Sequence, residues 1–243
     1  MKKICLIIFL SMFCIVDNLM GIEPTSGKEL IEMMREKYQD KFYKTLCFSQ
    51  QISRFKEDTV YSTEVMHEAY KSPGNLILKF RSWDSGDGLV FANDSLYTIN
   101  DGVVDKVEYR LHDILVLGID VYNVDPEVTI ANIKKLNYNL DLITTDKCMG
   151  KDAWLVGDPS SNCFWVDKDN LLFLKVQTRR NDISRSVEFI NYEYIEGAPV
   201  ATTINFYDNN GKLTMVEKYF DVRPFAKVDS EIFDPKNFVS AKW

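Results

Sequence analysis

Apolar and polar positions alternate on both sides of a turn-forming segment at residues 72–75. One alternating run covers residues 60–70, and in the next run Leu76, Leu78 and Phe80 fall on the same face. A period of two predicts strands that bury one face, and the Ser-Pro-Gly-Asn segment between them predicts the turn of a hairpin. The pattern therefore predicts an antiparallel sheet in the first third of the chain.

The same period continues through most of the sequence and is interrupted by turn-forming residues. Asp101 and Gly102 are a strong hairpin signal, because Asp and Gly tolerate the positive φ angles of a tight turn. Glu196-Gly197 and residues 208–211 predict further hairpins. The predicted strands cover residues 45–52, 59–71, 75–83, 88–92, 95–100, 103–109, 140–145, 153–156, 163–166, 171–180, 186–195, 198–207 and 212–222.

Three segments depart from this period and predict helices. The first, residues 26–38, begins with a capping box formed by Ser26 and Glu29. The second, residues 110–118, is too apolar for a solvated loop and predicts a short helix that covers part of the sheet. The third, residues 125–137, begins with an Asp-Pro pair suited to the cap and the first helical position.

Many antiparallel strands and few helices place the chain in the mainly β (α+β) class. We expect a strongly curved antiparallel sheet or incomplete barrel, with the helices packed against its concave side. No Ser/Gly/Pro-rich linker or shift in composition divides the 243 residues, and this favours one domain over two.

The first 21 residues have the plan of a secretory signal peptide. Lys2 and Lys3 precede an apolar run over residues 4–16, and Gly21 provides a small residue for cleavage. The apolar run is shorter than the roughly 20 residues that a membrane-spanning helix needs, which favours cleavage over the alternative of an uncleaved anchor. We therefore expect a signal peptide at residues 1–21, an exported domain at residues 22–243, and a periplasmic location.

Charge and cysteine usage narrow the class of protein further. The net charge is −7, and loss of the signal peptide with its two lysines and one aspartate makes it −8. Such an acidic chain is a poor partner for nucleic acid.

Three cysteines remain after loss of the signal peptide: Cys47, Cys148 and Cys163. A hairpin of residues 153–167 would place Cys163 opposite Gly157, away from Cys148. We expect three free thiols rather than a disulfide.

No sequence motif indicates catalysis or a cofactor. His67 and His112 are the only histidines, and neither has a cysteine or carboxylate at zinc-like spacing. A nucleophile elbow, a phosphate-binding loop and a dinucleotide fingerprint are all absent from the sequence. A carboxylate pair would require tertiary contact among Glu64, Glu68, Asp120 and Asp125. We therefore expect no metal, no cofactor and no enzymatic activity.

The order of several short motifs resembles the LolA/LolB lipoprotein-carrier superfamily. These motifs follow a predicted exported N-terminal helix and span most of the chain after the signal peptide. They are the Lys-Ser-Pro-Gly-Asn-Leu hairpin at 71–76, the Cys-Phe-Trp-Val-Asp-Lys strand at 163–168 with Leu171-Leu172 after its turn, the hairpin at 192–199 with the strand at 204–207, and Ile-Phe-Asp-Pro at 232–235.

The resemblance implies a half-open β-barrel whose concave side is lidded by helices and shelters acyl chains. Members of the superfamily carry lipoproteins or lipids across the periplasm. We therefore expect the protein to bind acyl chains of a lipoprotein or lipid and to exchange them with a membrane-bound donor and acceptor. We also expect it to be a monomer. The alternative is a ligand-sensing or protein-interaction domain on the same scaffold. In the family's soluble carriers an arginine before the hairpin proline hydrogen-bonds to the lid; here Ser72 takes that position, with Arg54 and Arg81 as possible replacements.

Alternation within the predicted strands and helices supplies candidates for lipid-binding residues. The candidates for the cavity wall are Phe48, Met66, Leu78, Phe80 and Phe91. The candidates for the lid are Leu115, Leu117 and Ile133. The alternative interpretation is that the same residues fill an ordinary core or a permanently packed helix.

Overall fold

The structure is a computed structural model that describes residues 23–181 and 183–243. The predicted signal peptide at residues 1–21 lies outside the described residues.

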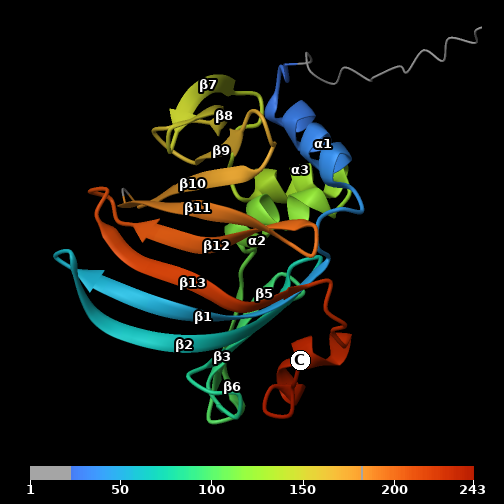
Figure 1. Cartoon of the computed structure of the whole chain (residues 1–243), viewed down its shortest axis with the longest axis vertical. Helices are drawn as coiled ribbons and strands as arrows, with labels where there is room; N and C mark the ends of the chain where they lie inside the picture. The colour runs from blue at the N-terminus through green and yellow to red at the C-terminus, as the bar shows by residue number, and fades with distance from the viewer. Residues whose placement is uncertain (1–22, 182) are drawn as a thin grey trace, which may run out of the picture.

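Within the described part of the chain, thirteen strands form a single curved antiparallel sheet that does not close into a barrel (Figure 1). Its spatial order is β6-β5-β4-β3-β2-β1-β13-β12-β11-β10-β9-β8-β7. The first six strands and the last seven are thus two meanders joined where β1 pairs with β13. The strands are β1 (Thr45–Lys56), β2 (Thr59–Lys71), β3 (Asn75–Phe80), β4 (Gly88–Ala92), β5 (Ser95–Asn100), β6 (Val103–Tyr109), β7 (Ile143–Cys148), β8 (Lys151–Gly157), β9 (Cys163–Asp167), β10 (Phe173–Arg180), β11 (Ile183–Ile195), β12 (Ala198–Tyr207) and β13 (Leu213–Pro224).

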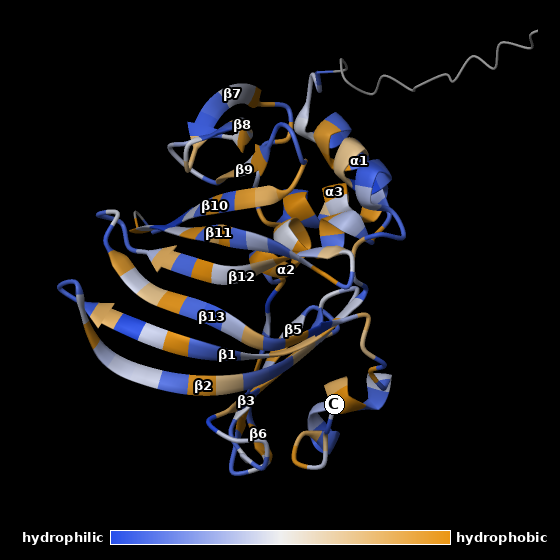
Figure 2. Ribbon diagram, viewed as in Figure 1, coloured by the Kyte–Doolittle hydropathy of each residue, from blue (hydrophilic) through white to orange (hydrophobic). Residues whose placement is uncertain are grey.

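The hairpin predicted at residues 72–75 is confirmed. It joins β2 to β3 with Glu68 opposite Leu78 and Met66 opposite Phe80, so these four side chains share one face of the sheet. Gly74 has φ of +64°, a left-handed conformation that glycine adopts without steric conflict. Figure 2 shows the resulting alternation of hydrophobic and hydrophilic residues along strands such as β1 and β13.

The helices gather beside the β8–β12 half of the sheet (Figure 1). They are α1 (Gly27–Tyr38), α2 (Asp113–Gly118) and α3 (Pro126–Lys135), together with the short 3₁₀ turn η1 (Asp120–Tyr122). Two further 3₁₀ turns, η2 (Ser230–Phe233) and η3 (Pro235–Asn237), belong to the C-terminal segment and lie beside β3, β4 and β6. The predicted caps of the first and third helices are present: Ser26 accepts a hydrogen bond from the Glu29 N–H, and Asp125 accepts one from the Glu127 N–H.

Several helix and strand boundaries differ from the sequence-based prediction, and backbone contacts explain two of them. The helix expected from residue 110 begins at Asp113, because the Arg110 N–H donates to the Asp94 carbonyl and His112 is extended. The strand expected at 140–145 begins at Ile143. Leu140 is instead buried, and its carbonyl accepts from the Gly27 N–H at the start of α1.

The main hydrophobic core lies between the concave face of the sheet and the helices. A second core forms where the C-terminal segment packs against the other face of β1–β5. There Lys79 is buried, and its ammonium donates to the carbonyls of Trp83, Val239 and Ala241 at 2.9–3.2 Å. These bonds compensate the ammonium for its lost hydration and hold the end of the chain on the sheet.

All three cysteines in the described residues are buried and free, as the sequence predicted. Cys163 lies opposite Gly157 in the β8–β9 pair, the register expected from the hairpin argument. Burial raises the pKa of the Cys148 thiol to about 11 and that of Cys163 to about 12. These thiols belong to the packed interior and have no reactive character.

Candidate functional site

An apolar cavity of about 180 Å³ lies between the concave face of the sheet and helix α2. Six strands contribute to one wall, and α2 with the residues next to it forms the opposite wall. The residues that line the cavity are Phe42, Tyr43, Leu46, Phe48, Gln50, Glu68, Tyr70, Leu76, Leu78, His112, Ile114, Leu115, Gly118, Ile119, Phe189, Tyr192, Ala201, Ile204, Phe206, Met215, Glu217 and Tyr219. Pockets for drug-sized ligands usually measure about 300–1,000 Å³, so this closed form has room for only a short apolar segment.

The cavity adjoins a wider hollow of about 850 Å³ on the surface, which we call the entrance hollow. The two share His112, Ile114, Phe206 and Met215 in their walls. A displacement of the start of α2 would therefore join the narrow interior to the wider space outside it.

Three of the predicted site residues line the cavity. Phe48 and Leu78 belong to the sheet wall and Leu115 to the α2 wall. The Phe48 ring stacks on Tyr219 with ring centroids 4.2 Å apart, so the floor between β1 and β13 is aromatic. That these residues bind lipid stays a prediction.

The other five lie outside the cavity lining. Met66 is buried and Phe80 half-buried farther along the face that carries Leu78. Phe91 packs edge-on against the His112 ring, with ring centroids 4.6 Å apart, and faces a separate hollow. Leu117 and Ile133 are fully buried in the main core beneath the helices.

Helix α2 and the η1 turn, residues 113–122, form the segment that covers the cavity, and we call it the lid segment. A set of hydrogen bonds, which we call the latch, joins the β2–β3 hairpin to this segment at Asp120. Asp120, the first residue of η1, accepts from the Tyr70 hydroxyl at 2.5 Å, the Ser72 hydroxyl at 2.9 Å and the Gly74 N–H at 3.0 Å. Asp120 is 5% exposed, and burial raises its pKa to about 6 although the three hydrogen bonds act in the opposite direction. Ser72, where the resemblance places an arginine, thus does contact the lid.

The two proposed replacements for that arginine have other partners. Arg54 pairs with Glu64 at 2.8 Å, and Arg81 pairs with Asp87 beyond the end of β3. The role of Asp120 in the latch was not predicted, because the sequence analysis named this residue only as a candidate for a carboxylate pair. The sequence did hold one indication of this role. Asp120 directly follows an apolar helix, and an acidic residue at such a buried position needs hydrogen-bond donors.

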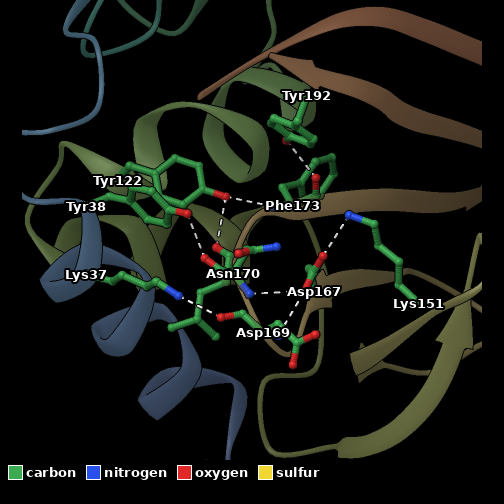
Figure 3. Close-up of polar contacts among 10 residues, drawn as sticks. Lys37, Tyr38, Tyr122, Lys151, Asp167, Asp169, Asn170, Phe173 and Tyr192 are labelled. Carbon is green, nitrogen blue, oxygen red and sulfur yellow. Dashed lines mark hydrogen bonds and ion pairs between the residues drawn. The ribbon is translucent and has the colours of Figure 1, made fainter. Parts of the chain in front are cut away.

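The far end of the lid segment is anchored to the sheet through the β9–β10 turn (Figure 3). The Tyr122 hydroxyl accepts from the Phe173 N–H at 2.7 Å and donates to the Leu171 carbonyl at 3.3 Å. From α1, Lys37 and Tyr38 donate to the carbonyls of Asp169 and Asn170, each at 2.7 Å. These contacts fix Tyr122 and α1 to the sheet, so any opening of the lid is confined to residues before Tyr122.

Asp167 holds the shape of that turn. Its carboxylate accepts from the N–H groups of Asp169 and Asn170 and from the Lys151 ammonium at 2.8 Å (Figure 3). Burial disfavours ionisation of Asp167, but these donors outweigh it and keep the pKa of its carboxyl below the ordinary value. The turn is therefore a rigid support for the helices.

Polar side chains interrupt the apolar wall of the cavity on β1, β2 and β13. Gln50 donates through Nε2 to the Glu68 carboxylate at 2.5 Å, and Glu217 lies in the wall on the neighbouring strand. Burial raises the pKa of Glu217 to about 8, against the effect of the Arg54 charge. Burial and the nearby charge of Glu217 raise the pKa of Glu68 as well. Sequence reasoning missed this cluster, although Gln50 stands at an apolar position of the alternating run of β1.

Within residues 23–181 and 183–243, no group of three or more His, Cys, Asp or Glu side chains is placed to hold a metal ion. In the same part of the chain, no helix is both long enough and apolar enough to span a bilayer.

No protein-family model and no curated protein matches this chain. Several solved structures do match it in fold. A DUF1329 family protein from Desulfovibrio piger superimposes with a TM-score of 0.56 at 16% identity, covering 86% of this chain and 95% of its own. A putative outer membrane lipoprotein-sorting protein domain from Vibrio parahaemolyticus gives 0.57 at 14% identity, covering 88% and 98%. A LolA superfamily protein from Nitrosomonas europaea gives 0.56 at 16% identity, covering 84% and 96%. Together with the curved, unclosed sheet, these matches show that the chain has a LolA-like fold.

Proposed function

We propose that this protein is a periplasmic carrier that binds the acyl chains of a lipoprotein or lipid and transfers them towards the outer membrane. Residues 1–21 would direct its export, and residues 22–243 would form one carrier domain. The observation that carries the proposal is the apolar cavity between the concave sheet and α2, in a fold shared with a lipoprotein-sorting domain.

Burial of an acyl chain supplies the driving force. Each methylene taken out of water contributes about 0.8 kcal/mol, and the aqueous space between two membranes offers no other apolar site. The closed cavity is too small for a long chain, so binding requires α2 to move away from the sheet and open the cavity to the entrance hollow. A membrane-bound donor and acceptor would supply and remove the cargo, and no catalytic step is involved.

The direct test is extraction of lipid from protein purified out of the periplasm, with identification by mass spectrometry, and titration with a fluorescent fatty acid. Leu78→Trp places a large ring in the cavity wall and displaces about two methylenes of bound chain, which weakens binding about 15-fold. Leu111→Trp is the matched control, since Leu111 is also half-buried but lies outside the cavity lining. Protein without bound lipid that takes up no fatty acid would contradict the proposal.

One observation favours the alternative of a protein-interaction domain. The edge strand β6 exposes Val103, Val107 and Tyr109, and an exposed apolar edge can pair with a strand of another chain. A stable complex with a periplasmic protein that survives removal of lipid and is abolished by Val107→Lys would support this function over the carrier.

A further inference from the structure

Two buried polar atoms without partners face the cavity from opposite walls. Gln50 is 2% exposed, and its Oε1 has no hydrogen-bond partner because Nε2 alone is used by Glu68. On the other wall, Nδ1 of His112 is also buried and without a partner. A buried acceptor left unpaired costs about 1–3 kcal/mol, so native structures seldom keep one without a reason. A ligand that donates a hydrogen bond to Gln50 Oε1 inside the cavity would remove the penalty at that atom.

The groups around Gln50 are also acceptors. Glu68 is 4% exposed and uses one carboxylate oxygen for Gln50, while Glu217 has no hydrogen-bond partner among the described residues. In the register, Gln50 lies opposite Met66 and Tyr219, and Glu68 and Glu217 are diagonal to it on the two neighbouring strands of the same face. An amide oxygen and two carboxyl groups, one on each side of Gln50 along β1, therefore line one otherwise apolar space. Once the carboxyl groups ionise, the chemical group that complements them is an ammonium.

We infer that the cavity binds an amphiphile whose polar end is an ammonium group, held by Gln50, Glu68 and Glu217 with the alkyl chain in the apolar remainder. This inference rests on the proposed function and names its class of ligand. Gln50 supports this assignment independently of the acidic pair, because its Oε1 is a buried acceptor without a partner and its side chain lines the same cavity.

An anionic amphiphile is the competing ligand, because the entrance hollow carries arginines. Two of them, Arg54 and Arg110, already pair with carboxylates of Glu64 and Glu108. The unpaired acceptors lie deeper, in the cavity itself. Inside that space a ligand carboxylate would meet two acidic side chains and have no cation to pair with among the residues that line it.

Binding of an ammonium is expected to be linked to pH through the acidic pair. The titratable groups in the cavity walls are Glu68, Glu217, His112, Tyr43, Tyr70, Tyr192 and Tyr219, with Arg54 and Glu64 just beyond. Burial holds His112 neutral, with a pKa lowered to about 4, and burial raises the pKa of each of the four tyrosines. Glu217, whose pKa is about 8, is therefore expected to change charge between pH 6 and pH 9.

The test compares three probes with one chain length: dodecylamine, dodecanol and dodecanoate. The amine stays protonated in this range, as lysine does. Its affinity is expected to rise more than about tenfold from pH 6 to pH 8, because an ionised Glu217 binds the ammonium and a protonated one must first lose its proton. Dodecanol should show no such rise, and dodecanoate should bind most weakly.

Glu217→Gln keeps the size of the side chain and removes its charge, so it should abolish the rise for dodecylamine and leave dodecanol binding unchanged. Glu188→Gln is the matched control, since Glu188 pairs with Lys175 and lies outside the cavity lining. Equal affinity of the wild-type protein for all three probes, or a preference for dodecanoate, overturns the inference and leaves the carrier function standing. Failure of all three probes to bind overturns the carrier function itself.

Discussion

Replacement of Asp120 by asparagine should remove a specific pH dependence of stability. In the folded protein, burial raises the pKa of this carboxyl from 3.8 to about 6, whereas in the unfolded chain it keeps its ordinary value. Because the folded pKa is the higher one, the folded state binds more protons between pH 4 and pH 6. The stabilisation from this group is thus complete below pH 4 and is lost as the pH rises through 6.

The size of the effect follows from the pKa difference. A rise from 3.8 to about 6 corresponds to about 3 kcal/mol in the free energy of unfolding. The asparagine side chain would keep the oxygen that accepts from Tyr70 and Ser72, but its amide nitrogen cannot accept from the Gly74 N–H. That loss contributes about 1 kcal/mol at every pH. The difference between wild type and Asp120→Asn should therefore change by about 2.5 kcal/mol from pH 4 to pH 7, most of the full effect.

Urea unfolding of both proteins at pH 4, 5, 6 and 7 measures this difference directly. His112 contributes with the opposite sign, because its folded pKa of about 4 lies below its ordinary value and its stabilisation is lost as the pH falls. Since His112 is present in both proteins, its contribution cancels. A difference that stays constant across the four pH values would refute the assignment of the raised pKa to Asp120.

The same carboxyl should control opening of the lid, because a locally opened latch exposes Asp120 to water. Ionisation then favours the open form, and hydrogen exchange in residues 113–122, corrected for the chemical rate, should speed up above pH 6 in wild type and not in Asp120→Asn. A latch protected equally at pH 5 and pH 7 would contradict this reasoning.

Three further predictions concern the support of the site. Tyr122→Phe leaves the buried Phe173 N–H without its acceptor and should lower the free energy of unfolding by about 1–3 kcal/mol in urea, whereas Tyr61→Phe, at an exposed site, should have no effect. Lys79→Met removes the donor to two C-terminal carbonyls, those of Val239 and Ala241, and should make the last residues sensitive to limited proteolysis; unchanged resistance would show that the second core alone holds them. The thiols of Cys47, Cys148 and Cys163 should fail to react with a thiol reagent at pH 8 until urea is added, because all three are buried and burial raises the pKa of each.

The strands were predictable because a sheet with one buried face imposes a period of two on the sequence. Boundaries failed where a contact distant in sequence decided the local structure, as at Leu140, whose carbonyl is used by the start of α1. The cavity was only partly predictable. Alternation assigns Phe48 and Leu78 to a face, but the curvature of the sheet decides that Met66 and Phe80, on that same face, lie beyond the cavity. Glu217 and Gln50 were missed because polar residues at buried positions contradict the pattern used to find them.

The latch inverts the arrangement that the resemblance implies, and this has a mechanical consequence. With an arginine before the hairpin proline, the hairpin would supply a permanent charge and the lid its acceptors. Here the hairpin supplies three neutral donors and the lid supplies Asp120, a group whose charge depends on pH. Two residues later, Tyr122 fixes η1 to β10. The hinge must therefore lie between Asp120 and Tyr122, so Asp120 moves together with α2. Helix α2, which carries Ile114 and Leu115 into the cavity wall, is the part that must swing to admit a chain.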